Sequence, residues 1–464
     1  MNTIWNPDLS LHERPKYRAL TDALRADIAA GVLPVGTRLP TVRDLAWRLS
    51  VTPGTVARAY QAAVQDGLLE ATVGRGTFVA PTARPADPAN EPGYTGVPDG
   101  GMLDFRSPCL PEVGQTALIS AALRRVAADH RLNWIDYTSQ DQEAPLRAAV
   151  VDWLAGRRMG PVGVADIVLA HGGQNAIRSV LDSCLTGDRP VVLTEALAYP
   201  GFRYAARLAR ADVVGLALDG EGVRPDALEA ACRRHRPQVL CLTPQVQNPT
   251  VAVMGPQRRA EIVAIARHHN LQVIEDECYA VPGEDVVTLR DLAPERVWYI
   301  GSLSKQLSAA LRFGYVVCPT GRGGAARLAA QHSYFALPLP LSALCLDLLQ
   351  GGHAAAICGA IAQDMGRRVD LMVRHLGRFD LTWAAGVPFV WLRLPQGWRA
   401  STFTRMAEDA GILMRSADQY AAIHDQVPHA VRLAVPGQAT MADLEAGLVT
   451  LARMLADPPS DMAV

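Results

Sequence analysis

The sequence predicts an α/β protein in which a small, mainly helical N-terminal domain is joined by a linker to a large domain with a mainly parallel β-sheet. Residues 12–80 alternate short helical patterns with turn signals. Residues 81–101 are rich in Pro, Gly and Asp and have almost no large aliphatic side chains, which indicates a semi-extended linker. In residues 102–458, short apolar runs alternate with amphipathic runs, a pattern typical of parallel strands covered by helices on both faces.

The N-terminal segment predicts a helix-turn-helix followed by a two-stranded wing. Residues 16–31 form an amphipathic pattern, with Leu20, Leu24 and Ile28 on one face. Thr41 can cap a second helix over residues 42–49, and a third helix is expected over residues 55–66. Two short helices joined by a tight turn can place the second helix in the major groove of DNA. The alternative interpretation is a small interaction domain whose arginines are simply solvated.

The large domain contains seven short apolar runs that we interpret as buried strands. They cover residues 167–170, 191–194, 212–216, 239–243, 271–275, 297–300 and 315–318. Two further strand-like runs around residues 386–394 and 429–435, with flanking helices, predict a smaller C-terminal α+β lobe.

Length, composition and cysteine spacing limit the functional classes. A chain of 464 residues exceeds one ordinary core, and 49% hydrophobic with 20% charged residues describes a soluble globular protein. We find no secretory signal and no uncharged apolar run long enough to span a membrane, so we expect a cytoplasmic protein without a membrane partner. The eight cysteines are scattered without metal-ligand spacing, so we expect free thiols and no metal.

The charge of the chain is unevenly distributed. The formal net charge is −1, but residues 14–79 carry nine Lys or Arg against five Asp or Glu, a balance of +4 that leaves −5 for the rest. A mildly basic N-terminal segment followed by an acidic remainder indicates that the two parts of the chain have different functions.

Lysine is almost absent from the sequence, which draws attention to Lys305. Of the 45 Lys and Arg residues only two, Lys16 and Lys305, are lysines, so 43 are arginines. Unlike arginine, lysine can lose its proton when partly buried and attack a carbonyl as a free amine. Lys305 lies in an apolar stretch with Ser302, Ser304 and Arg312 nearby. This pattern fits a lysine that holds pyridoxal 5'-phosphate (PLP) as a Schiff base, with hydroxyls and a guanidinium directed at the phosphate. The alternative is an ordinary exposed lysine.

Other candidate site residues follow the predicted strands. A Gly-Gly pair that opens a helix can approach a phosphate, although such turns are also common for geometric reasons alone. A tyrosine at the next turn could stack on a flat ring or be an ordinary turn aromatic. An amide and a second tyrosine could hydrogen-bond a phenolic oxygen, and a carboxylate could keep a pyridinium nitrogen protonated. These candidates are Gly172, Gly173 and Gln174; Tyr199; Asn248 and Tyr279; and Asp276.

The N-terminal segment resembles the winged-helix domain of GntR-type repressors. The resemblance is carried by residues 36–46 (GTRLPTVRDLA), 55–60 (TVARAY) and 74–79 (GRGTFV). It implies a double-stranded operator DNA partner. The residues expected at the DNA are Arg38, Arg43, Arg58 and Arg75, with Thr52 and Thr55 at the entry of the recognition helix. The chain departs from the family at Pro53-Gly54, where the family usually places an arginine.

Residues 102–455 closely resemble the fold-type I PLP domain of class I/II aminotransferases. The resemblance implies that Lys305 is the Schiff-base lysine, Asp276 the pyridinium partner and Tyr199 the stacking residue, with Asn248 and Tyr279 on the phenolic oxygen. The implied phosphate ligands are Gly172, Gly173, Gln174, Ser302, Ser304 and Arg312, with Tyr137 reaching the phosphate of a neighbouring subunit. Arg432 matches the arginine that holds a substrate α-carboxylate, although it could be a surface strand residue. The chain departs from the family at Val251, where glycine is frequent, and at residues 141–143.

The combination of the two halves resembles the MocR subfamily of bacterial regulators. It implies a PLP-dependent, DNA-binding transcriptional regulator that senses a small amino compound by aldimine exchange at Lys305, works as a head-to-tail homodimer and is not primarily an enzyme. The alternative is an active PLP-dependent aminotransferase that carries a regulatory DNA-binding domain. A third possibility is a PLP-enzyme fold used only for dimerisation. The retention of five residues speaks against it: Lys305, Asp276, Asn248, Tyr279 and Arg312.

Overall fold

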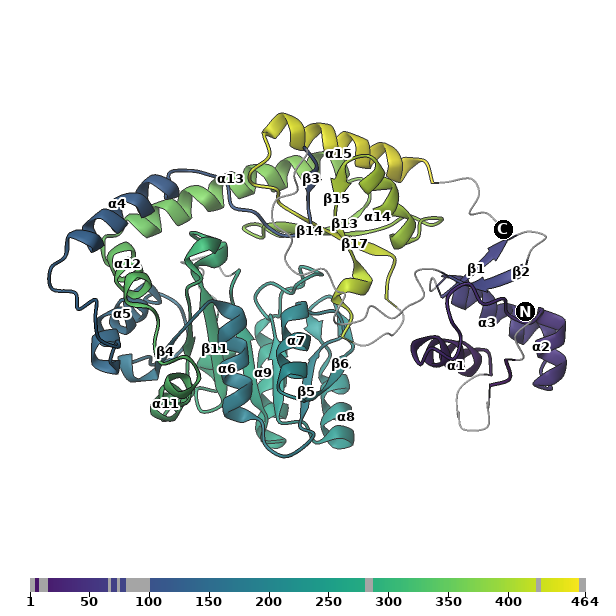
Figure 1. Cartoon of the computed structure of the whole chain (residues 1–464), viewed down its shortest axis with the longest axis horizontal. Coiled ribbons are helices and arrows are strands. Elements are labelled where there is room, and N and C mark those ends of the chain that lie inside the picture. Colours follow the sequence, from purple (N-terminus) through teal and green to yellow (C-terminus); the bar gives the residue numbers. More distant parts are fainter. Residues whose placement is uncertain are drawn as a thin grey trace. The chain divides into compact units, whose positions relative to one another are not determined.

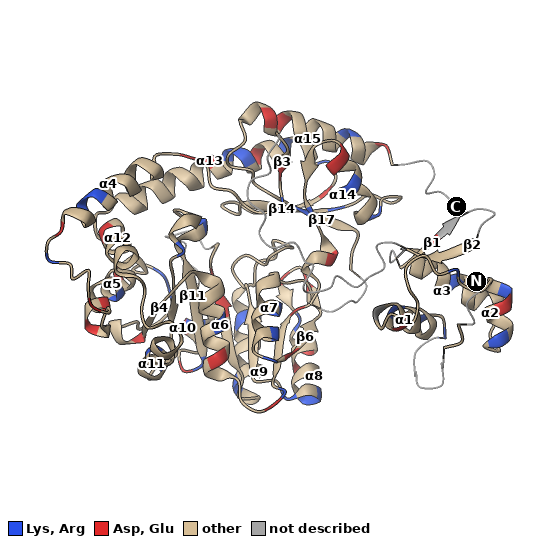
Figure 2. Ribbon diagram, in the orientation of Figure 1, with Lys and Arg blue, Asp and Glu red and all other residues tan. Residues whose placement is uncertain are grey.

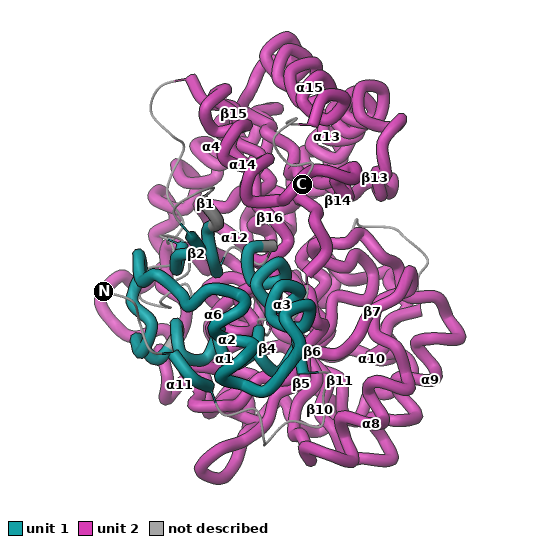
Figure 3. Tube along the Cα trace, turned by 90° about the vertical axis from the view of Figure 1, so that its right-hand side faces the viewer, with its two compact units in different colours: residues 1–99 teal, residues 100–464 magenta. Residues whose placement is uncertain are grey.

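The computed structural model describes residues 5–7, 16–65, 68–72, 76–80, 101–279, 287–422 and 427–458. The chain divides into two compact units, residues 1–99 and 100–464 (Figure 3). The predicted linker falls almost wholly outside the described residues. Each unit has hydrophobic clusters of its own.

The first unit contains three helices and a β-hairpin: α1 (Lys16–Ala29), α2 (Val42–Arg48), α3 (Pro53–Gln65), β1 (Leu69–Thr72) and β2 (Gly76–Val79). The strands pair antiparallel. Thr41 caps α2 by accepting a hydrogen bond from the N–H of Asp44 at 3.2 Å. The third helix begins at Pro53, two residues before the predicted start, because the fixed φ of proline suits the first helical position.

One apolar core holds the first unit together. It contains Leu20, Leu24 and Ile28 from α1 and Val56 and Tyr60 from α3. The four-residue spacing of these side chains in α1 therefore marks the face of the helix that is buried. The segment 5–7 contributes Trp5, whose Nε1 donates to Asp27 Oδ2 at 2.7 Å.

The second unit is organised around a seven-stranded sheet in the order β4-β12-β11-β10-β9-β5-β6, formed by residues that the structure describes (Figure 1). Its strands are β4 (Ile167–Ala170), β5 (Val191–Glu195), β6 (Asp212–Leu216), β9 (Val239–Leu242), β10 (Gln272–Asp276), β11 (Val297–Ser302) and β12 (Gly314–Val317). All neighbouring strands pair in parallel except β12, which is antiparallel to β11 and β4. The prediction of an α/β fold with a mainly parallel sheet is confirmed.

Both faces of this sheet are buried. Alternate residues of one strand belong to different clusters: Val192 and Ile274 pack with α6, α7 and α11, whereas Leu193 and Val273 pack with α8, α9 and α10. This alternation follows from the two-residue period of a strand and explains the continuous apolar runs. The helices are α6 (Gly173–Cys184), α7 (Pro200–Leu208), α8 (Pro225–His235), α9 (Pro256–His268), α10 (Leu289–Leu292) and α11 (Gly323–Tyr334). Figure 2 shows charged residues on these helices and loops and also on other helices of the chain.

Three other helices pack against β4 and β12 at the end of the sheet. They are α4 (Gln115–Ala128), α5 (Gln140–Trp153) and α12 (Leu339–Gln350), and α13 (His353–Leu376) leads from there to the C-terminal lobe. Short elements complete this part: η1 (Val164–Asp166), β7 (Leu218–Asp219), β8 (Gly222–Val223), η2 (Leu303–Lys305) and η3 (Ala309–Leu311).

The C-terminal lobe is α+β. A four-stranded sheet has the order β13-β14-β17-β16, with β13 (Asp380–Thr382), β14 (Phe389–Arg393), β16 (Arg415–Ser416) and β17 (Ala430–Ala434). The chain also forms α14 (Ala400–Asp409), β15 (Ile412–Leu413), η4 (Ala417–Tyr420) and α15 (Met441–Ala456). Strand β3 (Leu103–Asp104), from the start of the unit, pairs in parallel with β15.

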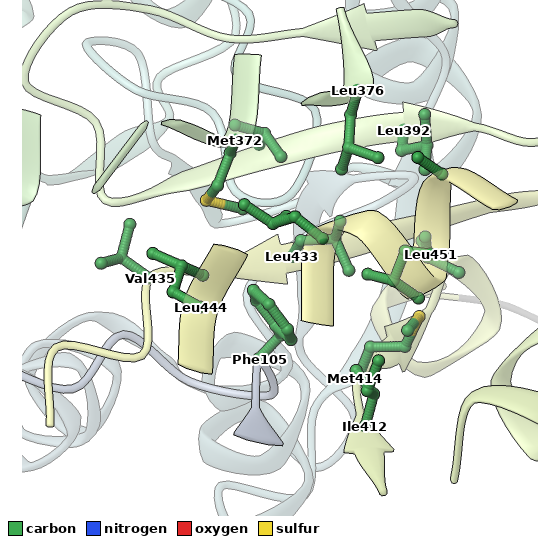
Figure 4. Close-up of a cluster of buried hydrophobic side chains, with 14 of the residues drawn as sticks. Phe105, Met372, Leu376, Leu392, Ile412, Met414, Leu433, Val435, Leu444 and Leu451 are labelled. Carbon is green, nitrogen blue, oxygen red and sulfur yellow. The ribbon is translucent and has the colours of Figure 1, made fainter. Parts of the chain in front are cut away.

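Phe105 anchors the start of the second unit in the core of this lobe. Its side chain is fully buried among Leu433, Leu444 and Ile412 (Figure 4). A segment more than 300 positions away in sequence therefore completes the core of the lobe.

Among the described residues, no single helix has the length and apolarity to cross a membrane; only α12 and α13 taken together, across a 79° bend, match by length and composition.

We expect Phe105→Ala to lower the free energy of unfolding of the second unit by about 3–5 kcal/mol, because it removes a fully buried ring and leaves a cavity. Urea unfolding followed by circular dichroism measures this loss. The control is Leu123→Ala, a large-to-small change on α4 at a half-exposed site, which we expect to cost within roughly 0.5 kcal/mol. Equal costs for the two variants would show that the segment does not belong to this core.

Candidate functional site

The predicted site residues of the second unit gather at one edge of the seven-stranded sheet. Strands β4, β5, β9, β10 and β11 run in the same direction, and their carboxyl ends therefore meet at this edge. Residues 171–174 follow β4, Tyr199 follows β5 and Asn248 follows β9. Asp276 is the last residue of β10, and Ser302 ends β11 just before η2, which contains Lys305.

Lys305 presents an amine that loses its proton more easily than an ordinary lysine. Its Nζ donates to the carbonyl oxygen of Pro108 at 3.2 Å and lies 3.4 Å from Ser107 Oγ. The pKa of Lys305 is lowered from 10.5 to about 8, mainly by burial and secondly by the nearby positive charge of Arg432. The neutral amine, the form that can attack an aldehyde, is therefore available near neutral pH.

Asp276 is a buried carboxylate with little compensation. Its Oδ1 accepts a hydrogen bond from the backbone N–H of Cys278 at 3.1 Å. Burial raises the pKa of Asp276, and the bonds from Cys278 only partly oppose this. A protonated nitrogen placed beside this carboxylate would stabilise its charged form.

A cluster of donors lies opposite, at the start of α6. Ser302 Oγ contacts Ser304 Oγ at 3.0 Å, and Arg312 donates to Ser304 Oγ and to the carbonyl of His171, both at 3.4 Å. Gly172 adopts a left-handed φ of 83°. The positive φ favours glycine, and a Cβ at this position would lie 2.7 Å from an Arg312 nitrogen, so a larger residue would also displace this guanidinium. Hydroxyls, a guanidinium and a helix N-terminus together suit a phosphate.

Between the donors and Asp276 lies Tyr199, the first residue before α7. Its ring makes an edge contact with Phe202 at 6.0 Å, and burial raises its pKa to about 12, so it stays a neutral phenol. Gln174 Nε2 donates to the carbonyl of Gly201 at 3.0 Å, while its buried Oε1 has no hydrogen-bond partner in the described structure. A Cβ on Gly173 would lie 2.8 Å from Cys278 Sγ, which shows how closely the loops approach here.

Asn248 and Arg432 are directly linked. Arg432, in the centre of β17, donates to Asn248 Oδ1 at 2.8 Å and to the carbonyl oxygen of Arg106 at 2.5 Å. Its guanidinium lies over the rings of Tyr420 and Phe389, 5.0 and 5.2 Å from their centroids. Arg432 is thus a buried, positioned cation and not the surface strand residue that was the alternative.

Tyr279 and Val251 complete the surroundings of Asn248. Tyr279 packs edge-on against Phe389 at 5.3 Å, and burial raises the pKa of its hydroxyl. Val251, at the position where glycine is frequent in the family, has a left-handed φ of 66° and a buried side chain. A β-branched residue is strained in this conformation.

This arrangement fits PLP group by group. The donors at the start of α6 match the phosphate, and Asp276, which lacks a cationic partner among the described residues, matches the ring nitrogen. The amine of Lys305 matches the aldehyde, and Tyr199 offers a flat face between them.

One predicted site residue is not brought to this cluster. Tyr137 lies in the segment between α4 and α5, is 81% exposed and stacks on Phe335 with ring centroids 5.2 Å apart. Among the described residues of one chain, Tyr137 makes no hydrogen bond, ion pair or ring contact with the other candidates. The role inferred for it requires a second subunit and stays a prediction.

Sequence reasoning missed several neighbours of the site. Ser107 and Pro108 contact Lys305, the carbonyl of Arg106 binds Arg432, and Phe389 and Tyr420 flank its guanidinium. Of these residues, only Phe389 and Tyr420 could be noticed in the sequence, as aromatic residues near the two C-terminal strand patterns. Aromatic residues of an ordinary hydrophobic core look the same.

In the first unit, the described arginines of the predicted DNA surface are exposed. Arg43 lies on α2, whose charged residues are both basic and acidic (Figure 2). Arg58, on α3, lies over the ring of Tyr17 at 4.3 Å, and Arg38 precedes α2. Thr52 Oγ1 accepts from the N–H of Thr55 at 3.2 Å and so caps α3. Arg75 lies outside the described residues.

The comparisons with known proteins agree with this organisation. Residues 111–451 match the family model "Aminotransferase class I and II", and residues 16–79 match "Bacterial regulatory proteins, gntR family". The chain is 29% identical to the uncharacterized HTH-type transcriptional regulator YdeF of Bacillus subtilis, over 98% of this chain and 97% of that one.

Two further similar proteins are a regulatory protein and an aminotransferase of known structure. The chain is 26% identical to the probable rhizopine catabolism regulatory protein MocR of Rhizobium meliloti, over 87% of this chain and 84% of that one. The crystal structure of LysN, an α-aminoadipate aminotransferase from Thermus thermophilus complexed with N-(5'-phosphopyridoxyl)-L-leucine, superposes with a TM-score of 0.68 and 25% identity. It covers 77% of this chain and 92% of that one.

The gntR-family match lies in the first unit and the aminotransferase match in the second, and the donor set described above suits PLP. The chain therefore belongs to the aminotransferase class I and II family and, through its N-terminal segment, to the MocR subfamily of GntR-type, PLP-binding transcriptional regulators.

Proposed function

We propose that this regulator senses a small amino compound at Lys305 and adjusts its affinity for operator DNA accordingly. The observation that carries the proposal is the Lys305 amine, which has a pKa of about 8 and lies near the buried guanidinium of Arg432. A nucleophilic amine and a carboxylate-binding cation near one another suit a ligand that carries an amino group and an acid.

In this proposal the cofactor provides an aldehyde that condenses reversibly with primary amines. Lys305 would hold it, Asp276 would keep its ring nitrogen protonated, and Tyr199 would stack on the ring. Asn248 and Tyr279 would bind the phenolic oxygen. The phosphate would be held by Gly172, Gly173, Gln174, Ser302, Ser304 and Arg312. Support comes from the donor set and from the buried, uncompensated charge of Asp276.

Arg432 would bind the carboxylate of the effector. Its two described hydrogen bonds go to neutral acceptors, Asn248 Oδ1 and the Arg106 carbonyl, so its charge is not neutralised by them. Because its position is fixed by these bonds and by two aromatic rings, a carboxylate would meet a preorganised fork.

The first unit would read operator DNA through Arg38, Arg43, Arg58 and Arg75, with Thr52 and Thr55 at the start of α3. The boundaries that we propose are 12–80 for the DNA-binding domain, 81–101 for the linker and 102–458 for the effector domain. The observed division between residues 99 and 100 lies close to the second boundary.

We further propose a head-to-tail homodimer. The segment between α4 and α5 exposes Trp134, Ile135 and Tyr137, with Ile135 93% exposed, and Phe335 is exposed beside Tyr137. A contiguous group of large exposed apolar side chains is typical of an interface. A second copy would cover it and bring Tyr137 to the phosphate of its partner.

The second candidate is a working aminotransferase with a regulatory domain. It is favoured by the presence in one pocket of an amine, a ring-nitrogen carboxylate and a carboxylate-binding arginine, Lys305, Asp276 and Arg432. Sustained transfer of amino groups from an amino acid to a keto acid over many turnovers would favour it over sensing alone.

We expect Lys305→Ala to abolish the visible absorbance band of the bound cofactor and the response of DNA binding to amines, while the fold and dimer persist. Lys16→Ala is the matched control, because it removes the other lysine of the sequence. Absorbance spectra, circular dichroism and light scattering of the three proteins provide the test. A cofactor band of normal intensity in Lys305→Ala would refute the assignment.

Cofactor-free protein should combine with PLP faster as pH rises, and the rate should level above the Lys305 pKa of about 8. The neutral amine fraction grows roughly tenfold per pH unit below the pKa and saturates above it. Stopped-flow absorbance across this range measures the profile. Since Arg432 is the second cause of the lowered pKa, Arg432→Gln should shift the profile to higher pH. A rate that keeps rising to the ordinary lysine pKa of 10.5 would contradict a perturbed Lys305.

Arg43→Ala and Arg58→Ala should each weaken operator binding. A lost phosphate contact should also reduce the slope of log affinity against log salt by about 0.9. Arg25→Ala is the control, because Arg25 lies on α1 and pairs with Asp22 at 3.2 Å. Fluorescence anisotropy with operator DNA at several salt concentrations measures both quantities. Unchanged affinity and slope in both test variants would mean that this face does not contact DNA.

A further inference from the structure

A second arginine faces the candidate site, and no motif singled it out. Arg415, in β16, is directly opposite Arg432 in the antiparallel register of β16 and β17. Directly opposed residues project from the same face of a sheet, with Cβ atoms about 4.5–5.5 Å apart. The two arginine side chains therefore leave the sheet on the same face, the one that carries Phe389.

This pairing of like charges is not compensated by any acid among the described residues. Arg432 uses neutral acceptors, as described above. Arg415 is half-buried and makes no hydrogen bond or ion pair with the residues that the structure describes. Opposed like charges destabilise a strand pair, and partly buried cations normally have an anionic partner. An anionic group beside the two arginines would therefore stabilise the pair.

Arg415 is also close to the cofactor position. Its charge acts on the hydroxyl groups of Tyr199 and Tyr420, where it opposes the rise in pKa that burial causes. Tyr199 is the residue that would stack on the cofactor ring, and Tyr420 lies beneath the Arg432 guanidinium. Arg415 thus lies near both the proposed ring-stacking residue and the aromatic ring beneath Arg432.

The other charges of the site already have assigned partners. Arg312 would face the phosphate, Asp276 the ring nitrogen, and Arg432 one carboxylate. Resting on the proposed function, we infer that Arg415 binds a second anionic group of the effector. The effector would be an amino acid whose side chain ends in a carboxylate, sulfonate or phosphonate. The planar guanidinium suits each of these oxyanions.

The inference is tested on full-length protein loaded with PLP, by titration with matched acid and amide pairs. L-glutamate and L-glutamine differ only in the side-chain charge, as do L-aspartate and L-asparagine, and L-cysteate provides a sulfonate. Half-saturation is read from the change in the visible absorbance band and, independently, from the shift in thermal unfolding temperature. We expect the wild-type protein to bind at least one acidic member about tenfold or more tightly than its amide.

In Arg415→Gln the preference should disappear. Affinity for the acid should fall by roughly tenfold to a hundredfold, whereas affinity for the amide should stay within about twofold. Arg415→Lys should keep part of the preference, because it retains a charge without the planar fork. Arg405→Gln, an equal charge change at an exposed position of α14, is the control and should leave both affinities unchanged.

Two outcomes would overturn the inference. Equal binding of acid and amide by the wild-type protein would show that no second anion is recognised. Equal loss for acid and amide in Arg415→Gln would show that this arginine serves the shared carboxylate or the fold. Failure of the proposed function gives a different result: no cofactor band in the wild-type protein, or no change of operator binding with any amine.

Discussion

Burial of charge at the carboxyl edge of the seven-stranded sheet is the constraint on which the site depends. Asp276 is the last residue of β10. The residue before it, Glu275, is fully buried and is held by hydrogen bonds and an ion pair. Glu275 accepts hydrogen bonds from the N–H groups of Leu289 and Arg290 at 2.8 and 3.0 Å and pairs with Arg259 at 3.3 Å. Removing one partner of such a buried pair leaves an uncompensated charge, so the position of β10 is strongly determined.

The same network links the sheet to distant parts of the unit. Arg290 is fully buried and donates to the carbonyl oxygens of Met159 at 2.6 Å and Cys318 at 3.3 Å. These acceptors lie before β4 and just after β12, the two strands at one end of the sheet order, whereas β10 is its central strand. A rigid support beneath Asp276 allows the site above it to keep unpaired charges that a looser fold would not tolerate.

The sequence carried most of the fold and part of the site. Runs 167–170 and 212–216 match β4 and β6 at both ends, because the apolar pattern ends with the strand. All residues of β4 are buried, whereas β6, at the edge of the sheet, is mostly half-buried. The antiparallel direction of β12 could not be predicted, since a strand buried on both faces looks the same in either direction. Lys305 could be predicted because lysine is nearly absent from the chain, and Asp276 and Asn248 because they lie at or just after strand ends. Ser107 and Arg415 could not, since tertiary contacts alone bring them there.

The left-handed backbone of Val251 has a consequence for how the site resists change. A β-branched residue in this conformation costs on the order of 1–2 kcal/mol, and the packing of its side chain with Leu197 and Phe389 offsets that cost. Asn248, three residues earlier, is attached to the same turn and bonded to Arg432. Apolar packing therefore keeps this turn in a strained conformation. We expect a mutation that weakens this packing to lower the affinity for the ligand before it unfolds the domain.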